Sequence, residues 1–248
     1  MALKNNTSLG QHWLYNREIL NTIAELAGDG EVCLEIGPGL GTLTSSLLKR
    51  FEKVVAVEYD SRLAENLPKS FPGKNLEVVN EDFLKFDLDK MPEEYYIAGN
   101  IPYYITSPII EKVLTCGKLP RRVVLLIQKE VAERIADEKE TVLSLFVKNR
   151  AEVKLGPVVM KDEFTPPPKV DSQVIIMEPY KEGARYPEEM FKLIKTAFKA
   201  PRKKVIHNLA SLKSKVELEG IFGKLGIDLN ARPSDLHLND YYKLYSEI

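Results

Sequence analysis

Short apolar runs alternate with helix-like segments over the first 180 residues of the chain. Each run spans four to six residues, and the segments that follow carry apolar residues at helical spacing. The runs are Val32–Ile36, Lys53–Glu58, Leu76–Val79, Tyr95–Gly99 and Val123–Gln128. This alternation predicts βαβ units, because the strands of a parallel sheet that is covered on both faces are apolar throughout.

Helical patterns accompany these strands. Leu43, Leu47 and Leu48 share one helical face, and Ser61 is a good N-cap for a helix over Arg62–Lys69. Three further segments that we expect to be helical are Ile109–Leu114, Lys129–Asp137 and Val142–Arg150.

Two more strand-like runs, Val153–Met160 and Gln173–Glu178, end this region, and we expect them to form an antiparallel end of the sheet. The segment Phe164–Pro168 between them contains consecutive prolines, so it can be neither a helix nor a central strand.

No strand pattern remains after about Tyr180. Four segments with helical spacing follow, namely Pro187–Lys199, Lys203–Leu212, Lys215–Leu225 and Asp235–Ser246. The sequence therefore predicts two domains: an α/β domain over residues 1–180, with a parallel sheet that ends antiparallel, and a small all-helical domain over residues 181–248.

Composition narrows the class of protein. The 248 residues are 44% hydrophobic and 29% charged, which is typical of folded globular domains. No apolar run approaches the roughly 20 residues that cross a bilayer, and the polar segment Met1–Gly10 does not resemble a secretory signal. Cys33 and Cys116 stand alone, which argues against a disulfide framework or a metal site. We expect a cytoplasmic protein with no membrane partner.

The net charge of −1 hides an uneven distribution. Residues 181–215 carry 10 Lys and Arg against 3 Asp and Glu, a net charge of +7. A local basic block on a nearly neutral chain favours an anionic partner docked at one region. The alternative is a solvated helix face that is rich in lysine.

A glycine-rich loop, Glu35–Gly41, lies between the first strand and the first predicted helix. Glycines at this position let the backbone approach a ligand and turn sharply into a helix. Glu58 ends the next strand and Asp82 follows the third, so both carboxylates would lie at the sheet edge where open α/β proteins bind ligands. Glu58 would accept hydrogen bonds from ribose hydroxyls, and Asp82 would meet an adenine edge. A tight structural turn is the alternative for the glycines alone.

The alternation of elements, the acidic residue before the loop and the spacing of three glycines resemble class I S-adenosylmethionine-dependent methyltransferases. The resemblance implies a Rossmann-like sheet and a cofactor site that includes Gly37, Gly39, Glu58 and Asp82. A nicotinamide enzyme is the competing interpretation, and it is weakened by the G-x-G-x-G spacing, which differs from the dinucleotide fingerprint.

The segment Asn100-Ile101-Pro102-Tyr103 follows the fourth strand and has residue types suited to methylating an adenine amine. The amine is a poor nucleophile because its lone pair is delocalised into the ring. The Asn100 oxygen and a backbone carbonyl beside Pro102 could accept its two hydrogens, while Tyr103 offers a face on which the base can stack. We expect the neighbouring Tyr104 to pack against the protein. A simple Asn-Pro turn with a packed tyrosine is the alternative for this segment.

Longer segments resemble the ribosomal RNA adenine dimethylases from about Gly10 to the end of the chain. Gly10–Leu14 is similar to their Gly-Gln-Asn-Phe-Leu motif, with His12 and Trp13 in place of Asn and Phe. Gly99–Pro108 is similar to their Gly-Asn-Leu-Pro-Tyr-Asn-Ile-Ser-Ser-Pro motif. The other matching segments are Gln128–Ile135, Phe164–Ser172 and Phe198–Leu209.

This resemblance implies roles for individual residues. The cofactor site would be formed by His12, Leu14, Gly37, Gly39, Glu58, Asp82 and Asn100. The catalytic pocket for the base would be formed by Asn100, Pro102 and Tyr103, with Phe164 over the other face of the base. Arg202, Lys203 and Lys204 would meet RNA phosphates, which gives affinity without sequence readout. For Phe164, packing beneath the proline run is an equal alternative.

The family has two branches, and the match favours the one that dimethylates two adjacent adenosines near the 3′ end of small-subunit (16S) ribosomal RNA during ribosome assembly. We therefore expect an S-adenosylmethionine-dependent enzyme that acts, as a monomer, on this RNA or on the precursor 30S particle. The other branch, which methylates a large-subunit adenosine and confers macrolide resistance, is an alternative. A DNA or protein methyltransferase and a non-catalytic RNA-binding assembly factor are two more.

Overall fold

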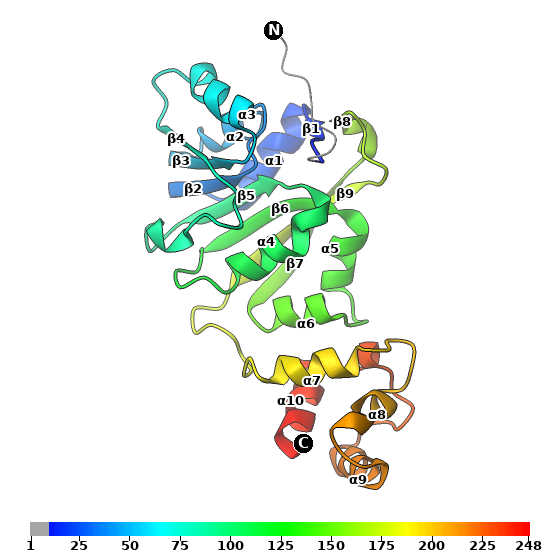
Figure 1. Cartoon of the computed structure of the whole chain (residues 1–248). Coiled ribbons are helices and arrows are strands. Elements are labelled where there is room, and N and C mark those ends of the chain that lie inside the picture. Colours follow the sequence, from blue (N-terminus) through cyan, green and yellow to red (C-terminus); the bar gives the residue numbers. More distant parts are fainter. Residues whose placement is uncertain (1–9) are drawn as a thin grey trace. The chain divides into compact units, whose positions relative to one another are not determined.

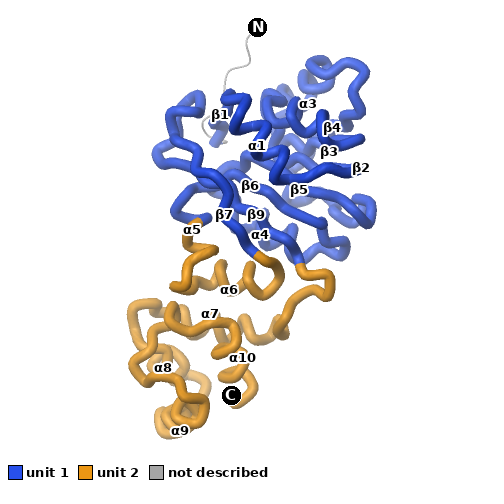
Figure 2. The backbone as a smooth tube through the Cα atoms, turned by 180° about the vertical axis from the view of Figure 1, so that it is seen from behind, with its two compact units in different colours: residues 1–132, 153–179 blue, residues 133–152, 180–248 orange. Residues whose placement is uncertain are grey.

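A computed structural model of the chain describes residues 10–248, and these residues form two compact units (Figure 2). The first unit, as far as it is described, contains residues 10–132 and 153–179, and the second contains residues 133–152 and 180–248. Of the polar N-terminal segment Met1–Gly10, which we expect not to be a secretory signal, only Gly10 lies within the described residues. The chain passes from one unit to the other three times, and the predicted boundary near residue 180 is one of these places. Residues 133–152, which the sequence placed in the first domain, pack with the second unit.

A seven-stranded sheet forms the centre of the first unit, in the order β4-β3-β2-β5-β6-β9-β7 (Figure 1). The strands are β2 (Gly30–Ile36), β3 (Phe51–Glu58), β4 (Leu76–Asn80), β5 (Tyr96–Asn100), β6 (Arg122–Gln128), β7 (Ala151–Val159) and β9 (Ser172–Pro179). The first five pair in parallel, with Val32 opposite Lys53 and Leu34 opposite Ile97. All five predicted strands are therefore confirmed, to within two residues at each end, although β4, at the edge of the sheet, contains no buried residue.

The far end of the sheet contains the two strands predicted after residue 150. β9 is antiparallel to β6, with Leu125 opposite Ile175, and β7 lies beyond it at the edge. A second, two-stranded sheet pairs β1 (Trp13–Leu14) with β8 (Phe164–Thr165), and no sequence pattern predicted it. A two-residue strand is too short to show alternation, so only the tertiary structure defines this pair.

Helices cover both faces of the sheet. α1 (Arg17–Ala27) packs on β5, β6 and β9, while α4 (Thr106–Val113) lies on the opposite face, as the two views show (Figures 1 and 2). α1 was not predicted, although its buried residues Leu20, Ile23, Ala24 and Ala27 have helical spacing and join the main core. The remaining helical segments are α2 (Thr44–Leu47), α3 (Ser61–Asn66), η2 (Leu67–Ser70), η3 (Leu88–Lys90), η4 (Tyr103–Ile105), η5 (Lys161–Glu163) and α5 (Lys129–Ala136), which crosses into the second unit.

The start of α3 differs from the prediction by one residue. Asp60, not Ser61, occupies the N-cap, where its carboxylate accepts the Arg62 backbone N–H at 3.1 Å. Asp and Ser are similarly good N-caps, so local sequence cannot choose between two adjacent candidates.

The second unit is entirely helical in its described elements. They are α6 (Val142–Lys148), α7 (Met190–Ala197), α8 (Val205–Asn208), η6 (Leu209–Ser211), α9 (Lys215–Leu225), η7 (Pro233–Asp235) and α10 (Leu238–Glu247). Their apolar faces share one core, in which Phe222 and Tyr241 are fully buried. The Tyr241 hydroxyl donates to the Pro233 carbonyl at 2.9 Å, so the one polar atom of this ring is paired.

Over residues 10–248, no helix is long and apolar enough to span a membrane, and no cluster of three potential metal ligands occurs. Cys33 is buried, Cys116 is partly exposed, and both are free thiols.

Candidate functional site

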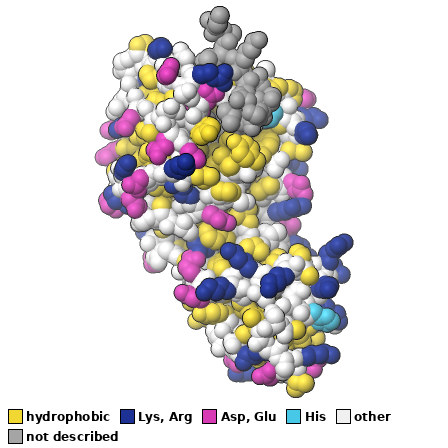
Figure 3. All heavy atoms as spheres, in the orientation of Figure 1, with side chains coloured by type: hydrophobic (Ala, Val, Ile, Leu, Met, Phe, Trp, Pro, Cys, Tyr) yellow, Lys and Arg dark blue, Asp and Glu magenta, His cyan; other side chains and the backbone are white. Residues whose placement is uncertain are grey.

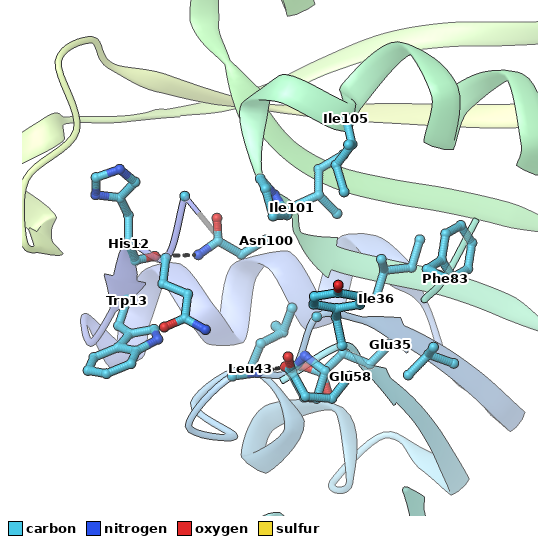
Figure 4. A pocket seen from close by; sticks show the side chains of 18 of the residues that line it. His12, Trp13, Glu35, Ile36, Leu43, Glu58, Phe83, Asn100, Ile101 and Ile105 are labelled. Carbon is cyan, nitrogen blue, oxygen red and sulfur yellow. Dashed lines mark hydrogen bonds between the residues drawn. The ribbon is translucent and has the colours of Figure 1, made fainter. Parts of the chain in front are cut away.

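A cavity of about 340 Å³ opens where the carboxyl ends of β2, β3, β4 and β5 meet (Figure 4). Parallel strands bring the loops that follow them to one sheet edge, which explains why segments distant in sequence line a single pocket. The lining comes from Leu20 of α1 and from five segments, namely Gly10–Leu14, most of Glu35–Leu43, Val57–Tyr59, Asp82–Leu84 and Asn100–Ile105.

The cofactor residues and most of the catalytic residues predicted from the sequence are brought together here. His12, Leu14, Gly37, Gly39, Glu58, Asp82, Asn100, Pro102 and Tyr103 all line this cavity.

The glycine loop keeps its backbone in conformations that side chains disfavour. Gly37, Gly39 and Gly41 have φ angles of +65°, +56° and +82°. Nothing lies within 4 Å of where a Cβ of Gly37 would be, so the backbone there faces open space. The loop can therefore be approached closely by a ligand.

Glu58 holds the glycine loop against the end of β3. One carboxylate oxygen accepts the Gly39 backbone N–H at 3.0 Å, and the other accepts the Asp60 backbone N–H at 2.8 Å. The residue is 6% exposed, and burial raises its carboxyl pKa, although the two backbone N–H groups oppose that shift. A carboxylate oxygen can accept more than one hydrogen bond and Glu58 lines the cavity, so it can accept ligand hydroxyls while it orders the loop.

Glu35 is a second buried carboxyl on the pocket wall. It is 1% exposed, and its Oε2 accepts the Thr44 hydroxyl at 2.6 Å. Burial raises its pKa to about 8, the Thr44 hydrogen bond opposes the rise, and the nearby Glu58 adds to it. Glu35 is therefore mostly protonated at neutral pH in the folded protein.

Asp82 and Phe83 form the wall that follows β4. The Asp82 Oδ1 accepts the Leu84 backbone N–H at 2.9 Å, which fixes the turn, and the side chain remains partly exposed to the pocket. Phe83 is 5% exposed and supplies a flat apolar surface beside it. A planar ring with polar edge groups would fit this corner.

The Asn100 side chain is oriented by the N-terminal segment. Its Nδ2 donates to the His12 backbone carbonyl at 3.1 Å, as the dashed line in Figure 4 shows. A carbonyl only accepts, so the amide nitrogen must face His12 and the Oδ1 is left free to accept a ligand hydrogen.

The His12 ring is hydrogen-bonded to the segment that contains Pro166. Its Nδ1 lies 2.7 Å from the Pro166 carbonyl, so this nitrogen carries the proton, and Figure 4 shows the ring turned away from Glu58. The position predicted to touch a cofactor through its side chain thus contributes a backbone carbonyl to Asn100.

Tyr103 is anchored beneath the loop. Its hydroxyl lies 2.6 Å from the Ser172 hydroxyl, and its ring is within 19° of parallel to that of His12 at 6.3 Å. Burial raises the pKa of the phenol. Pro102, with φ −60° and ψ 133°, directs the chain into the 3₁₀ turn that carries this ring.

Trp13 adds a polar atom without a partner. Its Nε1 is buried and finds no hydrogen-bond acceptor among residues 10–248. A Cβ on Gly39 would lie 3.4 Å from this nitrogen, so the indole edge packs against the glycine loop. An unpaired buried N–H costs about 1–3 kcal/mol, which makes this a position where a ligand acceptor would be favourable.

Two side chains differ from expectation. Phe164, predicted over the base, is 2% exposed, joins the main hydrophobic core and does not line the cavity, so the packing alternative describes its position. The reason is its place in β8, where pairing with Leu14 turns the ring inward. Tyr104, predicted to pack, is 65% exposed on the pocket rim.

Several lining residues were not predicted from the sequence. They are mostly apolar and include Ile36, Leu43, Tyr59, Phe83 and Ile105. Each lies within two residues of a predicted polar or glycine position, and that adjacency is the signal that could have found them.

Arg202, Lys203 and Lys204 are exposed in the second unit, in the turn between α7 and α8. The Lys204 Nζ donates to the Asn230 Oδ1 at 2.6 Å. These cations lie before α8, not within a helix that begins at residue 203 as the sequence predicted, because helical geometry starts at Val205.

Comparison with known proteins identifies relatives over the whole chain. The sequence model of the family "Ribosomal RNA adenine dimethylase" matches residues 2–248. The curated "Ribosomal RNA small subunit methyltransferase A" of Fusobacterium nucleatum is 36% identical, with 98% of this chain and 97% of that protein covered.

Solved structures have the same fold. A dimethyladenosine transferase from Plasmodium falciparum aligns with a TM-score of 0.81 at 29% identity and covers 95% of this chain and 97% of that one. The 23S rRNA methyltransferase ErmE aligns with a TM-score of 0.78 at 26% identity and covers 95% and 98%. The mostly parallel sheet is therefore that of a class I methyltransferase.

The protonated Glu35 makes stability depend on pH. Its folded pKa of about 8 lies above the ordinary value of 4.5, so its contribution is complete below pH 4.5 and is lost as the pH rises toward 8. Glutamine is neutral at every pH, so Glu35→Gln should not lose this stability. We therefore expect the free energy of unfolding of wild type to fall relative to that of Glu35→Gln by about 1.4 kcal/mol per pH unit across this window.

Denaturant unfolding at several pH values between about 5 and 8 measures this difference. Glu52→Gln, which removes the same charge at an exposed position of β3, is the control and should run parallel to wild type. Parallel curves for Glu35→Gln and wild type would contradict the protonated state of Glu35.

Proposed function

The chain belongs to the ribosomal RNA adenine dimethylase family, and we propose that it uses S-adenosylmethionine to dimethylate N6 of two adjacent adenosines near the 3′ end of small-subunit ribosomal RNA. The observation that carries the proposal is that Asn100, Pro102 and Tyr103 share one cavity with the glycine loop, Glu58 and Asp82. A methyl donor and an adenine amine can therefore meet within a single pocket.

The pocket fits S-adenosylmethionine on three sides. Glu58 can accept the ribose hydroxyls, while Asp82 and Phe83 suit the adenine edge and face. The orphaned Nε1 of Trp13, beside Gly39, offers a donor to the carboxylate of the amino-acid arm. When bound, the cofactor supplies an electrophilic methyl group on a positively charged sulfur.

The protein contributes alignment and lone-pair control at the amine. The Oδ1 of Asn100, left free because its Nδ2 binds the His12 carbonyl, accepts one amine hydrogen, and the Ile101 carbonyl next to Pro102 accepts the other. Accepting both hydrogens redirects the nitrogen lone pair out of the ring toward the methyl group. Holding the amine in line with the methyl group would then supply most of the rate acceleration.

Tyr103 positions the base. Its hydroxyl contact with Ser172 fixes the ring, and base–aromatic stacking contributes about 1–3 kcal/mol. No general base is required, because the proton released after methyl transfer can pass to water. The target adenosine must leave its stack to enter the cavity.

The degree of similarity favours the small-subunit branch. Curated relatives named "Ribosomal RNA small subunit methyltransferase A" are 33–38% identical, whereas the 23S rRNA methyltransferase ErmE is 26% identical. A ribosomal substrate also implies action in the cytoplasm, on RNA or on a partly assembled small subunit.

The second unit suits a docking role. Exposed Lys and Arg side chains gather on the face of this unit in Figure 3, and Arg202, Lys203 and Lys204 are adjacent cations in one turn. We assign cofactor binding to the sheet domain, predicted over residues 1–180, and RNA phosphate contacts to residues 181–248. The phosphate contacts would add affinity without sequence readout.

Mass mapping of ribosomal RNA tests the function. RNA from cells that lack this protein should lose dimethylation at two adjacent adenosines of small-subunit rRNA. Wild type should restore it, while Asn100→Ala should lower methyl transfer by about a hundredfold because the amine is no longer oriented. Loss of a large-subunit modification would support the other branch, and unchanged RNA would support a non-catalytic factor.

Cofactor affinity tests the assignment of Asp82. Asp82→Asn should weaken S-adenosylmethionine binding by about tenfold to a hundredfold, because hydrogen bonds to a charged acceptor contribute about 1.5–3 kcal/mol. The only tryptophan, Trp13, lines the pocket, so its fluorescence measures binding directly. Glu81→Gln removes the same charge one residue away, outside the lining, and should bind normally; equal affinity of Asp82→Asn and wild type would refute the site. Glu58→Ala should weaken binding as well, with a contribution from loosening of the glycine loop.

Salt dependence tests the basic turn. Replacing Arg202, Lys203 and Lys204 with glutamine should weaken binding to small subunits and reduce the log–log salt slope by about 0.7–0.9 for each phosphate that is no longer neutralised. Cofactor affinity should stay unchanged. The same replacement at Lys215, Lys224 and Lys243, also exposed in this unit, is the control. If the slope fell equally in both triple variants, or in neither, the turn would be no specific docking site.

A further inference from the structure

The two most exposed tyrosines among the described residues lie on the rim of the same cavity. Tyr104 is 65% exposed and Tyr59 is 64% exposed, and both line the pocket. A single exposed aromatic ring needs no explanation, but two at one mouth indicate ring faces that are kept free for a ligand. Tyr59 directly follows Glu58, on the side of the cofactor, while Tyr104 directly follows the Asn100–Tyr103 loop.

The Tyr104 ring is held in place despite its exposure. It belongs to η4, the turn that Pro102 begins. Gly10 packs against it, since a Cβ on Gly10 would lie 3.4 Å from the Tyr104 Cε1 and 3.4 Å from the Pro102 Cβ. Gly10 has a φ of +66°, and the absence of a side chain lets the ring edge lie this close. One edge of the ring thus lies against Gly10, while 65% of the residue's surface is exposed.

Consecutive tyrosines therefore have opposite environments. Tyr103 is half-buried and bonded to Ser172, whereas the Tyr104 side chain has no hydrogen bond and no aromatic partner within residues 10–248. Core packing accounts for the first ring and leaves the second unexplained. An aromatic face at the mouth of a base pocket suits a second base.

We propose that Tyr104 stacks on the nucleobase that neighbours the adenosine held by Asn100. This inference rests on the proposed function. When the target adenosine leaves its stack, the adjacent base loses a neighbour, and an aromatic ring at the rim replaces that neighbour. For two adjacent target adenosines, the base on Tyr104 is the other target, so this ring holds it at the mouth between the two modifications.

Steady-state methylation of small subunits from cells that lack this protein tests the proposal. Tyr104→Phe keeps the ring, and Tyr104→Leu replaces it with an apolar side chain that cannot stack. Tyr15→Leu, at a tyrosine that is 48% exposed and outside the lining, is the matched control. S-adenosylmethionine affinity is measured in parallel through Trp13 fluorescence.

Tyr104→Leu should raise the KM for the subunit by about tenfold and leave cofactor affinity unchanged. It should also yield more RNA in which only one of the two adenosines is modified. Tyr104→Phe should remain within about twofold of wild type, as should Tyr15→Leu.

An unchanged KM for Tyr104→Leu would overturn the proposal, as would a Tyr104→Phe variant as weak as the leucine variant, since the hydroxyl would then be the contact. If wild type itself failed to methylate small subunits, the proposed function would fall. That result is distinct from an active wild type whose KM is insensitive to Tyr104.

Discussion

One buried carboxylate, that of Glu58, holds together the cavity at the carboxyl edge of the sheet. Glu58 ends β3 and binds the backbone N–H groups of Gly39 and Asp60 with its two oxygens, so the glycine loop is tied to the start of α3. The Asp60 carboxylate in turn accepts hydrogen bonds from the side chains of Arg62 and Gln11. The hydrogen bond from Arg62 lowers the pKa of Asp60. The N-terminal segment, the glycine loop and α3 are therefore linked through adjacent acidic residues, and the cavity keeps its shape because these bonds are largely shielded from water.

A second link joins the opposite wall. Asn100 at the end of β5 binds the backbone of His12, and the His12 ring binds the Pro166 carbonyl. His12, Asn100 and Pro166, which are spread over more than 150 positions of the chain, thus determine the orientation of the Asn100 side-chain amide. That direction matters chemically, because only the oxygen of the amide can accept an amine hydrogen.

The two units contain different kinds of polar side chain. Carboxylates and glycines line the cavity at the carboxyl edge of the sheet, while adjacent exposed cations lie in the turn before α8 of the second unit. Under the proposed function, contacts with the RNA backbone would be made by the exposed cations of the second unit, because carboxylates at the cavity do not attract phosphates. Residues 181–215, with a net charge of +7, already concentrate cations in this part of the sequence.

Apolar runs alone determined the order of the strands along the chain and the parallel βαβ character, because burial on both faces requires continuous apolar residues. Glycines and carboxylates at strand ends identified Gly37, Glu58 and Asp82 as pocket residues, and the Asn-Ile-Pro-Tyr segment identified Asn100, since parallel strands bring their carboxyl ends together. Sequence could not decide which way single rings point. Phe164 is buried by a two-residue strand pair and Tyr104 is left on the rim by a 3₁₀ turn, and neither contact is encoded locally. The grouping of residues 133–152 with the helical unit also depends on long-range packing, which a boundary placed where the strand pattern ends does not detect.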